Sequence, residues 1–332
     1  MALINVNLLI RETRKMRGLT QEQLAEGICS RETIVKLENG KQKPNWYIIK
    51  EVLMRLGLDP ELYNTGVVSQ GEARLIEQLG ECFSLMNNMK FDEVKVLIDK
   101  IEAEIESQAD SVWRSELGHG LLLRIKAQFY SFTASSDIPF TYLNVSLAIE
   151  CALECLKTMR PNFELSNVPD YYLAVNEYRL LLVLAKSYVE SGDFDTGIQL
   201  YYMLKANMEK KYSYAMGVAH VNHTVNTQYR SMLYFMQIAL FRSKRYVEAI
   251  QLAEEGISIA IAARDFSDYA NYCGILGNCY HKLGQTEKMY EFYKRYYLII
   301  YLFDGHASFN FDFAMNRFEE EHGERLDLTV PW

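Results

Sequence analysis

The chain has 332 residues, 49% of them hydrophobic and 23% charged, and its net charge is −8. This composition is ordinary for a globular protein and excludes a disordered or fibrous chain, and the length suits two domains better than one. No apolar stretch reaches the length of a membrane span, no signal-peptide pattern opens the chain, and the six cysteines are scattered, so we expect a cytoplasmic protein with reduced thiols and no membrane contact.

The charge is distributed unevenly along the chain. Residues 1–65 contain ten Lys and Arg against eight Asp and Glu, a balance of +2, whereas residues 66–332 contain 25 against 35, a balance of −10. A slightly basic segment joined to an acidic body fits a nucleic-acid-binding module attached to a domain that does not contact nucleic acid.

Capping signals divide the N-terminal segment into short helices. Thr20 is an N-cap residue with Gln23 as its capping-box partner, and Ser30 is the N-cap residue of the next helix. Gly18 and Gly40 stand where helices end, since glycine tolerates the left-handed conformation that closes a helix.

The helix that follows Ser30 has an apolar and a polar face. Ile34 and Leu37 point toward a core. The outward positions are two pairs spaced four residues apart: Arg31 with Val35, and Glu32 with Lys36. A short helix with such an outward face, joined by a turn to another short helix, is the geometry that fits the major groove of DNA.

Residues 19–26 and 30–41, together with a fourth predicted helix at 46–56, resemble the phage-repressor-like helix-turn-helix family. The resemblance predicts a DNA-binding domain over residues 1–65. The turn at residues 27–30 is one residue shorter than the commonest form, and in this it resembles a subgroup of regulators that respond to peptide pheromones.

The family resemblance assigns roles to individual residues of this domain. It implies that Gln21 lies against a phosphate, that base edges are read by the outward face of the third helix, and that the adjoining backbone is held just beyond it. Arg14 and Glu38 are expected to form an internal ion pair that fixes the geometry. The alternative is that the polar residues are only solvated charges. The candidate DNA-binding residues are Gln21, Arg31, Glu32, Val35, Lys36, Asn39 and Lys41.

Beyond a linker at residues 66–71, one helix follows another to residue 332. Weakly similar segments begin at residues 91, 142, 194, 246 and 286, a spacing that suits helical hairpins. The segments at 185–200 and 276–292 resemble tetratricopeptide repeats, in which small residues let helices approach and aromatic residues fill the wedge between hairpins. We expect an all-α fold in which residues 72–332 form a right-handed superhelix with a concave groove.

The two halves together resemble the Rgg/PlcR/PrgX group of quorum-sensing regulators. That resemblance implies a homodimer that binds double-stranded promoter DNA and is controlled by a short signalling peptide held in the repeats. Amide side chains can pair with both the N–H and the C=O groups of an extended peptide. Polar residues on the first helices of three hairpins are therefore the candidate peptide-binding residues: Asn176, Arg179, Asn222, Asn226, Arg230, Asn271 and Asn278.

A dimer is also expected on physical grounds, because one helix-turn-helix reads only half of a palindromic site. The aromatic residues between 293 and 318 are the expected contributors to the dimer surface, since Tyr296, Tyr297, Tyr301 and Phe303 do not fit one helix face.

Other kinds of site are not indicated by the sequence. It has no phosphate loop, dinucleotide fingerprint or zinc-protease helix, so we expect no cofactor, no metal and no enzymatic activity. Cys151 and Cys155 are interpreted as buried thiols, and Cys29 has no adjacent Lys or His that would activate it. Two other functions stay open: a repressor whose helical domain serves only dimerisation or protein contact, and, more remotely, an enzyme with an acidic pocket.

Overall fold

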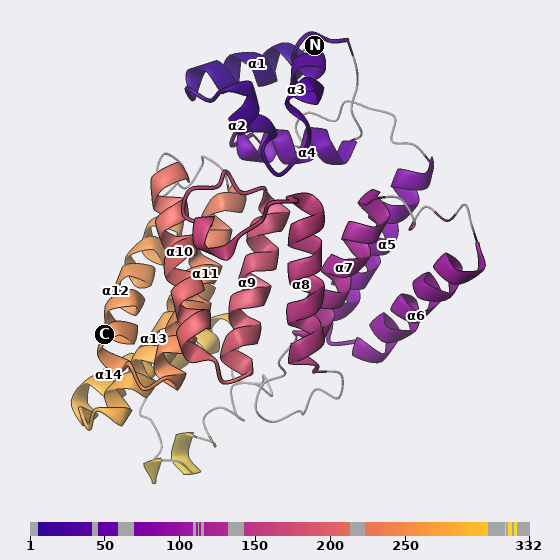
Figure 1. Ribbon diagram of the computed structural model, residues 1–332. Coiled ribbons are helices and arrows are strands. Elements are labelled where there is room, and N and C mark those ends of the chain that lie inside the picture. The colour runs from indigo at the N-terminus through magenta and orange to yellow at the C-terminus, as the bar shows by residue number, and fades with distance from the viewer. Residues whose placement is uncertain are drawn as a thin grey trace. The chain divides into compact units, whose positions relative to one another are not determined.

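The computed structural model describes residues 6–41, 46–58, 70–108, 111, 113, 116–131, 143–212, 223–304, 316, 318–320, 322 and 323. These residues form fourteen α-helices and no strand (Figure 1), which confirms the all-α fold class. The chain divides into two compact units, residues 1–213 and 214–332. No helix among the described residues is long and apolar enough to cross a membrane.

Four short helices, which we call the head, begin the first unit. They are α1 (Val6–Met16), α2 (Gln21–Ala25), α3 (Arg31–Glu38) and α4 (Trp46–Arg55). The helices pack around one hydrophobic core, and the core residues expected from the sequence lie in it fully buried: Leu24, Ile34, Leu37 and Leu53. The boundaries of these helices follow from their caps.

The expected caps of the head are confirmed. The Thr20 hydroxyl accepts from the Gln23 backbone N–H at 3.1 Å, and the Gln23 side chain accepts in return from the Thr20 N–H at 2.8 Å. The Ser30 hydroxyl accepts from the Thr33 N–H at 3.2 Å. Because these contacts satisfy N–H groups that a helix start leaves open, they fix where α2 and α3 begin.

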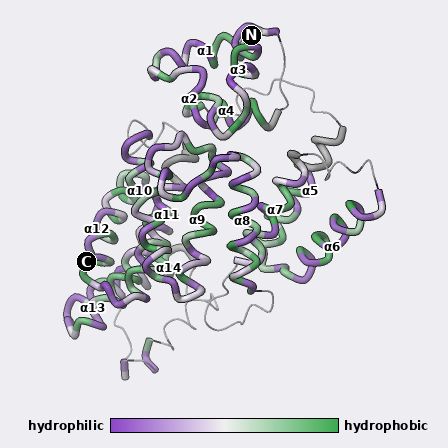
Figure 2. The backbone as a smooth tube through the Cα atoms, in the orientation of Figure 1, coloured by the Kyte–Doolittle hydropathy of each residue, from purple (hydrophilic) through white to green (hydrophobic). Residues whose placement is uncertain are grey.

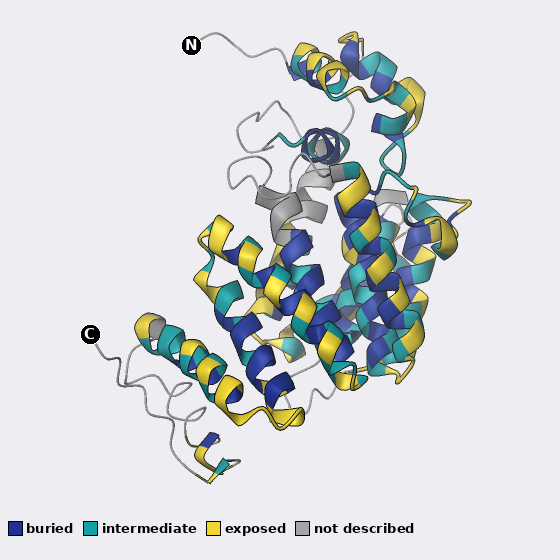
Figure 3. Cartoon of the chain, turned by 90° about the vertical axis from the view of Figure 1, so that its left-hand side faces the viewer, coloured by how far each residue is buried: buried dark blue, intermediate teal, exposed yellow. Residues whose placement is uncertain are grey.

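The first unit continues with helices that pack in sequence as antiparallel neighbours. They are α5 (Gln70–Asn87), α6 (Phe91–Ser107), α7 (Glu116–Tyr130), α8 (Val145–Met159), α9 (Val175–Glu190) and α10 (Phe194–Tyr212), with a short 3₁₀ turn at Leu165–Asn167. Apolar residues of α5, α6 and α7 close around Trp113, which is fully buried. Hydrophobic and hydrophilic residues alternate along most helices (Figure 2), so most of them bury one side and expose the other (Figure 3), whereas Arg179 is the one exposed residue of α9.

The second unit is built from two further helical hairpins. Its helices are α11 (His223–Arg242), α12 (Tyr246–Ala263), α13 (Phe266–Lys282) and α14 (Thr286–Asp304). The repeat starts predicted at residues 91, 194, 246 and 286 are the first residues of α6, α10, α12 and α14. The start predicted at residue 142 lies outside the described residues, and α8 begins three positions later, at Val145.

Glycine and tyrosine interlock where the helices of the second unit meet. A Cβ atom on Gly256 of α12 would lie 2.4 Å from the Tyr272 ring of α13, and one on Gly277 of α13 would lie 2.7 Å from the Tyr293 ring of α14. Both rings are buried. The predicted use of small residues for close approach and of aromatic rings as wedges is therefore confirmed in these helices.

Candidate DNA-binding surface and repeat groove

Helix α3 presents the polar face expected of a recognition helix. Arg31 and Glu32 are exposed and Val35 and Lys36 are half-buried, while the opposite face is in the head core. Lys36 Nζ lies 2.7 Å from Glu32 Oε1, and the hydrogen bond from Lys36 lowers the pKa of Glu32. Arg31 is thus the longest exposed donor on this face, and Glu32 with Lys36 forms a donor–acceptor pair beside it.

An ion-pair network holds α3 in place. Arg14 of α1 donates through Nε to Glu38 Oε1 at 2.5 Å and through Nη2 to Glu38 Oε2 at 3.0 Å, which confirms the expected internal pair. Burial would raise the pKa of Glu38, but hydrogen bonds from Arg14 and Gln21 outweigh it and the pKa is lowered. The bidentate contact fixes both the distance and the angle between α1 and α3.

Gln21 and the residues after α3 already make contacts within the head. Gln21 opens α2, as expected, and its amide donates to Glu38 Oε2 at 2.8 Å. Asn39 is exposed and its amide donates to the Val35 carbonyl at 2.9 Å, at the end of α3. Lys41 is exposed. The phosphate contacts expected of these residues stay predictions. Gln21 and Asn39 would make such contacts through polar atoms that do not take part in the two bonds described here.

The short turn between α2 and α3 lies against α9. Gly27 has φ +70°, and a Cβ atom there would stand 2.2 Å from Glu177 Oε2, so only glycine fits without displacing that carboxylate. Cys29 in the same turn is half-buried, and burial raises its pKa to about 11 despite the nearby Arg55. A raised pKa favours the neutral thiol over the reactive thiolate, in line with the sequence interpretation.

Ionic and amide groups join the head to α8 and α9. Arg160, which follows α8, donates to Glu177 Oε1 at 3.0 Å and to Glu26 Oε1 at 2.5 Å. Glu51 of α4 accepts from the Asn176 amide at 2.7 Å and from the Val175 backbone N–H at 3.2 Å. Burial raises the pKa of Glu51, opposed by Arg124, Arg55 and Arg179.

This contact was missed in the sequence analysis. One signal was present: Glu51 stands among apolar residues of the fourth helix, from Ile48 to Leu53. A carboxylate at a buried helical position requires a partner, but the sequence does not say which.

The candidate peptide-binding residues in the first unit have two different surroundings. Arg179 is exposed on α9. Asn176 is 3% exposed and bonded to Glu51, so the structure places it in the contact with the head, away from an open strip. The two candidates on this helix therefore differ in their surroundings, because α9 begins against α4, and their peptide-binding role stays a prediction.

The candidate peptide-binding residues in the second unit also differ in burial and in their hydrogen bonds within the chain. Arg230 is 6% exposed and donates to Asp268 Oδ2 at 2.6 Å and to Asp265 Oδ2 at 2.8 Å. Asn271 is half-buried, and the exposed Asn278 accepts from the Tyr293 hydroxyl at 2.6 Å. Arg230 is thus already paired with two carboxylates, through its Nε and Nη2 atoms.

Two candidates cannot be placed. Asn222 lies outside the described residues, and for Asn226 the backbone of α11 is described but the side chain is not. The peptide-binding role of the whole set stays a prediction.

The C-terminal aromatic residues pack on one another. The rings of Tyr293 and Phe318 are 5.2 Å apart and those of Tyr297 and Phe318 are 5.8 Å apart, and all three residues are buried. Tyr296 and Tyr301 are half-buried, and Phe303 has no described side chain. Part of the segment expected at a dimer surface is thus used within the chain. Cys151 and Cys155 are buried thiols, as predicted.

Comparison with known proteins supports this description. Residues 10–62 match the model of a helix-turn-helix family. A helix-turn-helix-type transcriptional regulator of uncharacterized role from Methanothermobacter thermautotrophicus is 46% identical over 50 residues, which are 15% of this chain and 72% of that protein.

Solved structures match over most of the chain. PlcR from Bacillus thuringiensis, solved in complex with the peptide PapR7 and DNA, is 18% identical, with a TM-score of 0.52 over 91% of this chain and 96% of that one. ComR from S. thermophilus, solved with DNA and its signalling peptide ComS, is 11% identical, with a TM-score of 0.42 over 96% of this chain and all of that one. The sequence resemblance to the Rgg/PlcR/PrgX group is thus accompanied by a shared fold. The chain belongs to the helix-turn-helix family of transcriptional regulators, and its fold is that of PlcR.

Proposed function

We propose that the protein is a dimeric transcription regulator that binds promoter DNA through α3 and is controlled by a short signalling peptide bound in its repeat helices. The observation that carries the proposal is the contact between head and repeats in the first unit. Glu51 with Asn176, and Arg160 with Glu26 and Glu177, join the DNA-binding helices to α8 and α9.

The surface of α3 supports the DNA-binding part. Arg31 can donate to guanine, Glu32 can accept from cytosine and Val35 can contact a thymine methyl group. Because Arg14 and Glu38 fix α3 through two hydrogen bonds, this face is presented in one orientation. A fixed orientation reduces the loss of conformational entropy on binding DNA.

The head–repeat contact supports the regulatory part. A peptide that binds one arrangement of the repeats more tightly than another shifts the population toward that arrangement. Since α9 carries both Asn176 and Glu177, a shift of α9 changes the contacts of α4 and of the α2–α3 turn at once. The PlcR structure, which contains both a peptide and DNA, has this fold.

The DNA-binding part is tested by selecting a binding site from random duplexes and measuring affinity by fluorescence anisotropy. Arg31→Ala should weaken binding to the selected site by about 1–3 kcal/mol and leave weak binding to unrelated DNA largely intact. Equal losses on both duplexes would make Arg31 a phosphate contact and refute the assignment. The exposed Lys157 of α8, changed to Ala, is the matched control that should alter neither affinity.

The peptide part is tested by titrating peptide fractions of the growth medium into the protein–DNA complex. We expect a change in DNA affinity that Asn226→Ala abolishes without altering DNA binding by the peptide-free protein. Arg31→Ala should show the converse, lost DNA affinity with peptide binding retained in calorimetry. If no fraction changes DNA affinity, the repeats serve dimerisation or protein contact only, which is the second function left open by the sequence.

The dimer is tested by sedimentation at micromolar concentration, with and without DNA. A dimer in both samples is expected. A monomer in both would contradict the proposal, because one head contacts only one half-site.

A further inference from the structure

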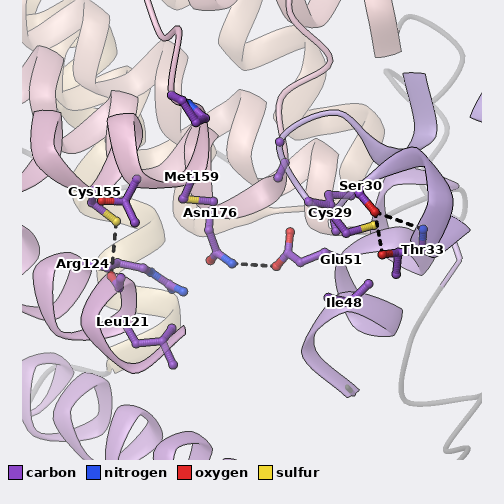
Figure 4. A pocket seen from close by; sticks show the side chains of 16 residues that line it. Cys29, Ser30, Thr33, Ile48, Glu51, Leu121, Arg124, Cys155, Met159 and Asn176 are labelled. Carbon is purple, nitrogen blue, oxygen red and sulfur yellow. Dashed lines mark hydrogen bonds between the residues drawn. The ribbon is translucent and has the colours of Figure 1, made fainter. Parts of the chain in front are cut away.

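A pocket of about 550 Å³ opens beside the head–repeat contact within the first unit. Ser30 and Ile48 line it from the head, Leu121 and Cys155 line it from α7 and α8, and the hydrogen bond between Asn176 and Glu51 crosses it (Figure 4). Its volume falls within the range of about 300–1,000 Å³ that small-molecule sites occupy. The pocket can therefore hold a small organic molecule.

Arg124 of α7 brings an unsatisfied charged group to this pocket. The residue is 7% exposed. Its guanidinium extends from α7 into the pocket, between the lining residues of the head and those of α7 and α8 (Figure 4). One face of the guanidinium lies 4.8 Å from the centre of the Phe83 ring, and Nε has no hydrogen-bond partner among the described residues. A buried donor without a partner is uncommon and costs free energy, so it indicates a missing acceptor.

The charges around the pocket favour an anion as that acceptor. Arg124, Arg55 and Arg179 all act electrostatically on Glu51, whose burial favours its neutral form. The neighbouring Glu26 and Glu177 carboxylates are both bound by Arg160. Arg124 and Glu51 are the charged residues among those that line the pocket, and burial favours the neutral form of Glu51, so the positive charge of Arg124 is left without a counter-charge there.

The rest of the lining is largely apolar. Ile28, Ile48, Leu121, Met159 and Pro161 line the pocket around its polar groups. A simple inorganic anion would leave these side chains in contact with water, whereas an anion with a hydrocarbon body would cover them. The lining therefore selects a molecule with one charged end and one apolar part.

We propose that this pocket is a second ligand site, which binds a small organic carboxylate through Arg124 and covers the carboxylate's hydrocarbon part with the apolar lining. The carboxylate accepts hydrogen bonds from the guanidinium, including its unused Nε, as a charge-assisted pair. Because Ser30 caps α3 and also lines the pocket, an occupied site touches both the recognition helix and the repeats. The site lies beyond the proposed peptide response, since it uses none of the candidate peptide-binding residues except Asn176.

Octanoate is the probe for this site, measured by calorimetry with the full chain and without DNA or peptide. We expect saturable binding of octanoate, much weaker binding of octan-1-ol, which has the same chain without the charge, and none of acetate, which has the charge without the chain. Arg124→Gln should weaken octanoate binding about tenfold or more, the loss of one charge-assisted contact. Arg242→Gln, an exposed arginine of α11, should leave it unchanged.

A second variant keeps the test valid should Arg124→Gln not fold, as judged by circular dichroism. Met159 is half-buried at the pocket, and Met159→Trp should fill it and reduce octanoate binding while the helical signal is retained. No octanoate binding by the parent protein, equal binding of octan-1-ol, or unchanged binding by both pocket variants would overturn the proposal. None of these outcomes depends on whether a peptide controls DNA binding.

Discussion

Helices α9 and α13 both open a helical hairpin, yet their asparagines have opposite surroundings. Asn176 in the first turn of α9 is 3% exposed and donates to the buried Glu51 of α4. Asn278 near the end of α13 is exposed and accepts from Tyr293 of the next helix. Two asparagines on the first helices of hairpins therefore do not share an environment.

The difference follows from what each helix packs against. Helix α13 packs on α12 and α14, its neighbours along the chain, as repeat helices do. Helix α9 packs on α8 and α10 and also on α4, which lies more than a hundred residues earlier. Among the described repeat helices of the first unit, α9 is therefore the one that packs most closely on the head. Mutations on the two helices should separate these roles.

Arg160→Met should have the largest effect on stability. Arg160 is the partner of Glu177, whose side chain is fully buried, and of Glu26 in the head. Its removal leaves a buried carboxylate without its counter-charge, so we expect a loss of about 3–5 kcal/mol in unfolding free energy, measured by urea denaturation. Adding Glu177→Met should recover much of that loss. A double variant as unstable as the single one would show that the charge pair is not the cause.

Asn176→Ala and Asn278→Ala compare the two helices directly. The first removes a donor from the buried Glu51 and should cost about 1–3 kcal/mol. The second removes an exposed acceptor that water can replace and should change stability by less than about 0.5 kcal/mol. Equal costs in urea denaturation would erase the distinction between α9 and α13.

Gly256→Ala tests the packing that α13 does depend on. A Cβ atom at this position would stand 2.4 Å from the buried Tyr272 ring, whose hydroxyl donates to the Arg230 carbonyl at 2.9 Å. Because this hydrogen bond keeps the ring from moving away, Gly256→Ala should lower the free energy of unfolding by about 1–2 kcal/mol, after the gain in helix propensity is subtracted. A Cβ atom on Gly80 of α5 would point into open space. Gly80→Ala should therefore raise the free energy of unfolding by about 0.5–1 kcal/mol. A stabilising Gly256→Ala would contradict the interlock.

The local architecture was predictable because it depends on residues close together in sequence. Caps such as Thr20 with Gln23 lie within one helical turn, and the repeat starts at Phe194 and Tyr246 follow from the spacing of similar segments. Arg14 with Glu38, 24 residues apart, was predicted only because the helix-turn-helix resemblance supplies that pair.

The head–repeat contact was not predictable in this way. Glu51 and Asn176 are 125 residues apart, and neither periodicity nor a capping pattern relates positions at that distance. The sequence indicated that the Asn176 amide would form hydrogen bonds with a bound peptide. The amide does form a hydrogen bond, but its partner is the Glu51 side chain of the same chain. Likewise Arg230 was selected for its charge. The two aspartates that pair with it lie at the start of α13, 35 and 38 residues further along the chain.

The dependence of stability on pH should differ between two glutamates of the head. Hydrogen bonds from Arg14 and Gln21 lower the pKa of Glu38 against the effect of burial. A carboxyl group with a lowered pKa stabilises the fold above its unfolded pKa, and the contribution is lost as the pH falls through the folded value. Glu38→Gln should therefore be less stable than the parent at neutral pH, and the difference should shrink on acidification below 4.5, the ordinary pKa of Glu.

Glu51 should show the opposite sign, as the smallest of these effects, because Arg124, Arg55 and Arg179 offset part of its burial. Burial raises its pKa, so its contribution is fully present below the ordinary value of 4.5 and is lost as the pH rises through the folded value. The unfolding free energy of the parent should then fall, relative to Glu51→Gln, as the pH is raised from 4.5 toward neutrality. Urea denaturation across that range measures the slope. Parallel curves for the parent and Glu51→Gln would mean that the Glu51 carboxyl group of α4, which contacts the start of α9, does not titrate in this range, and that α9 differs from α13 in packing alone.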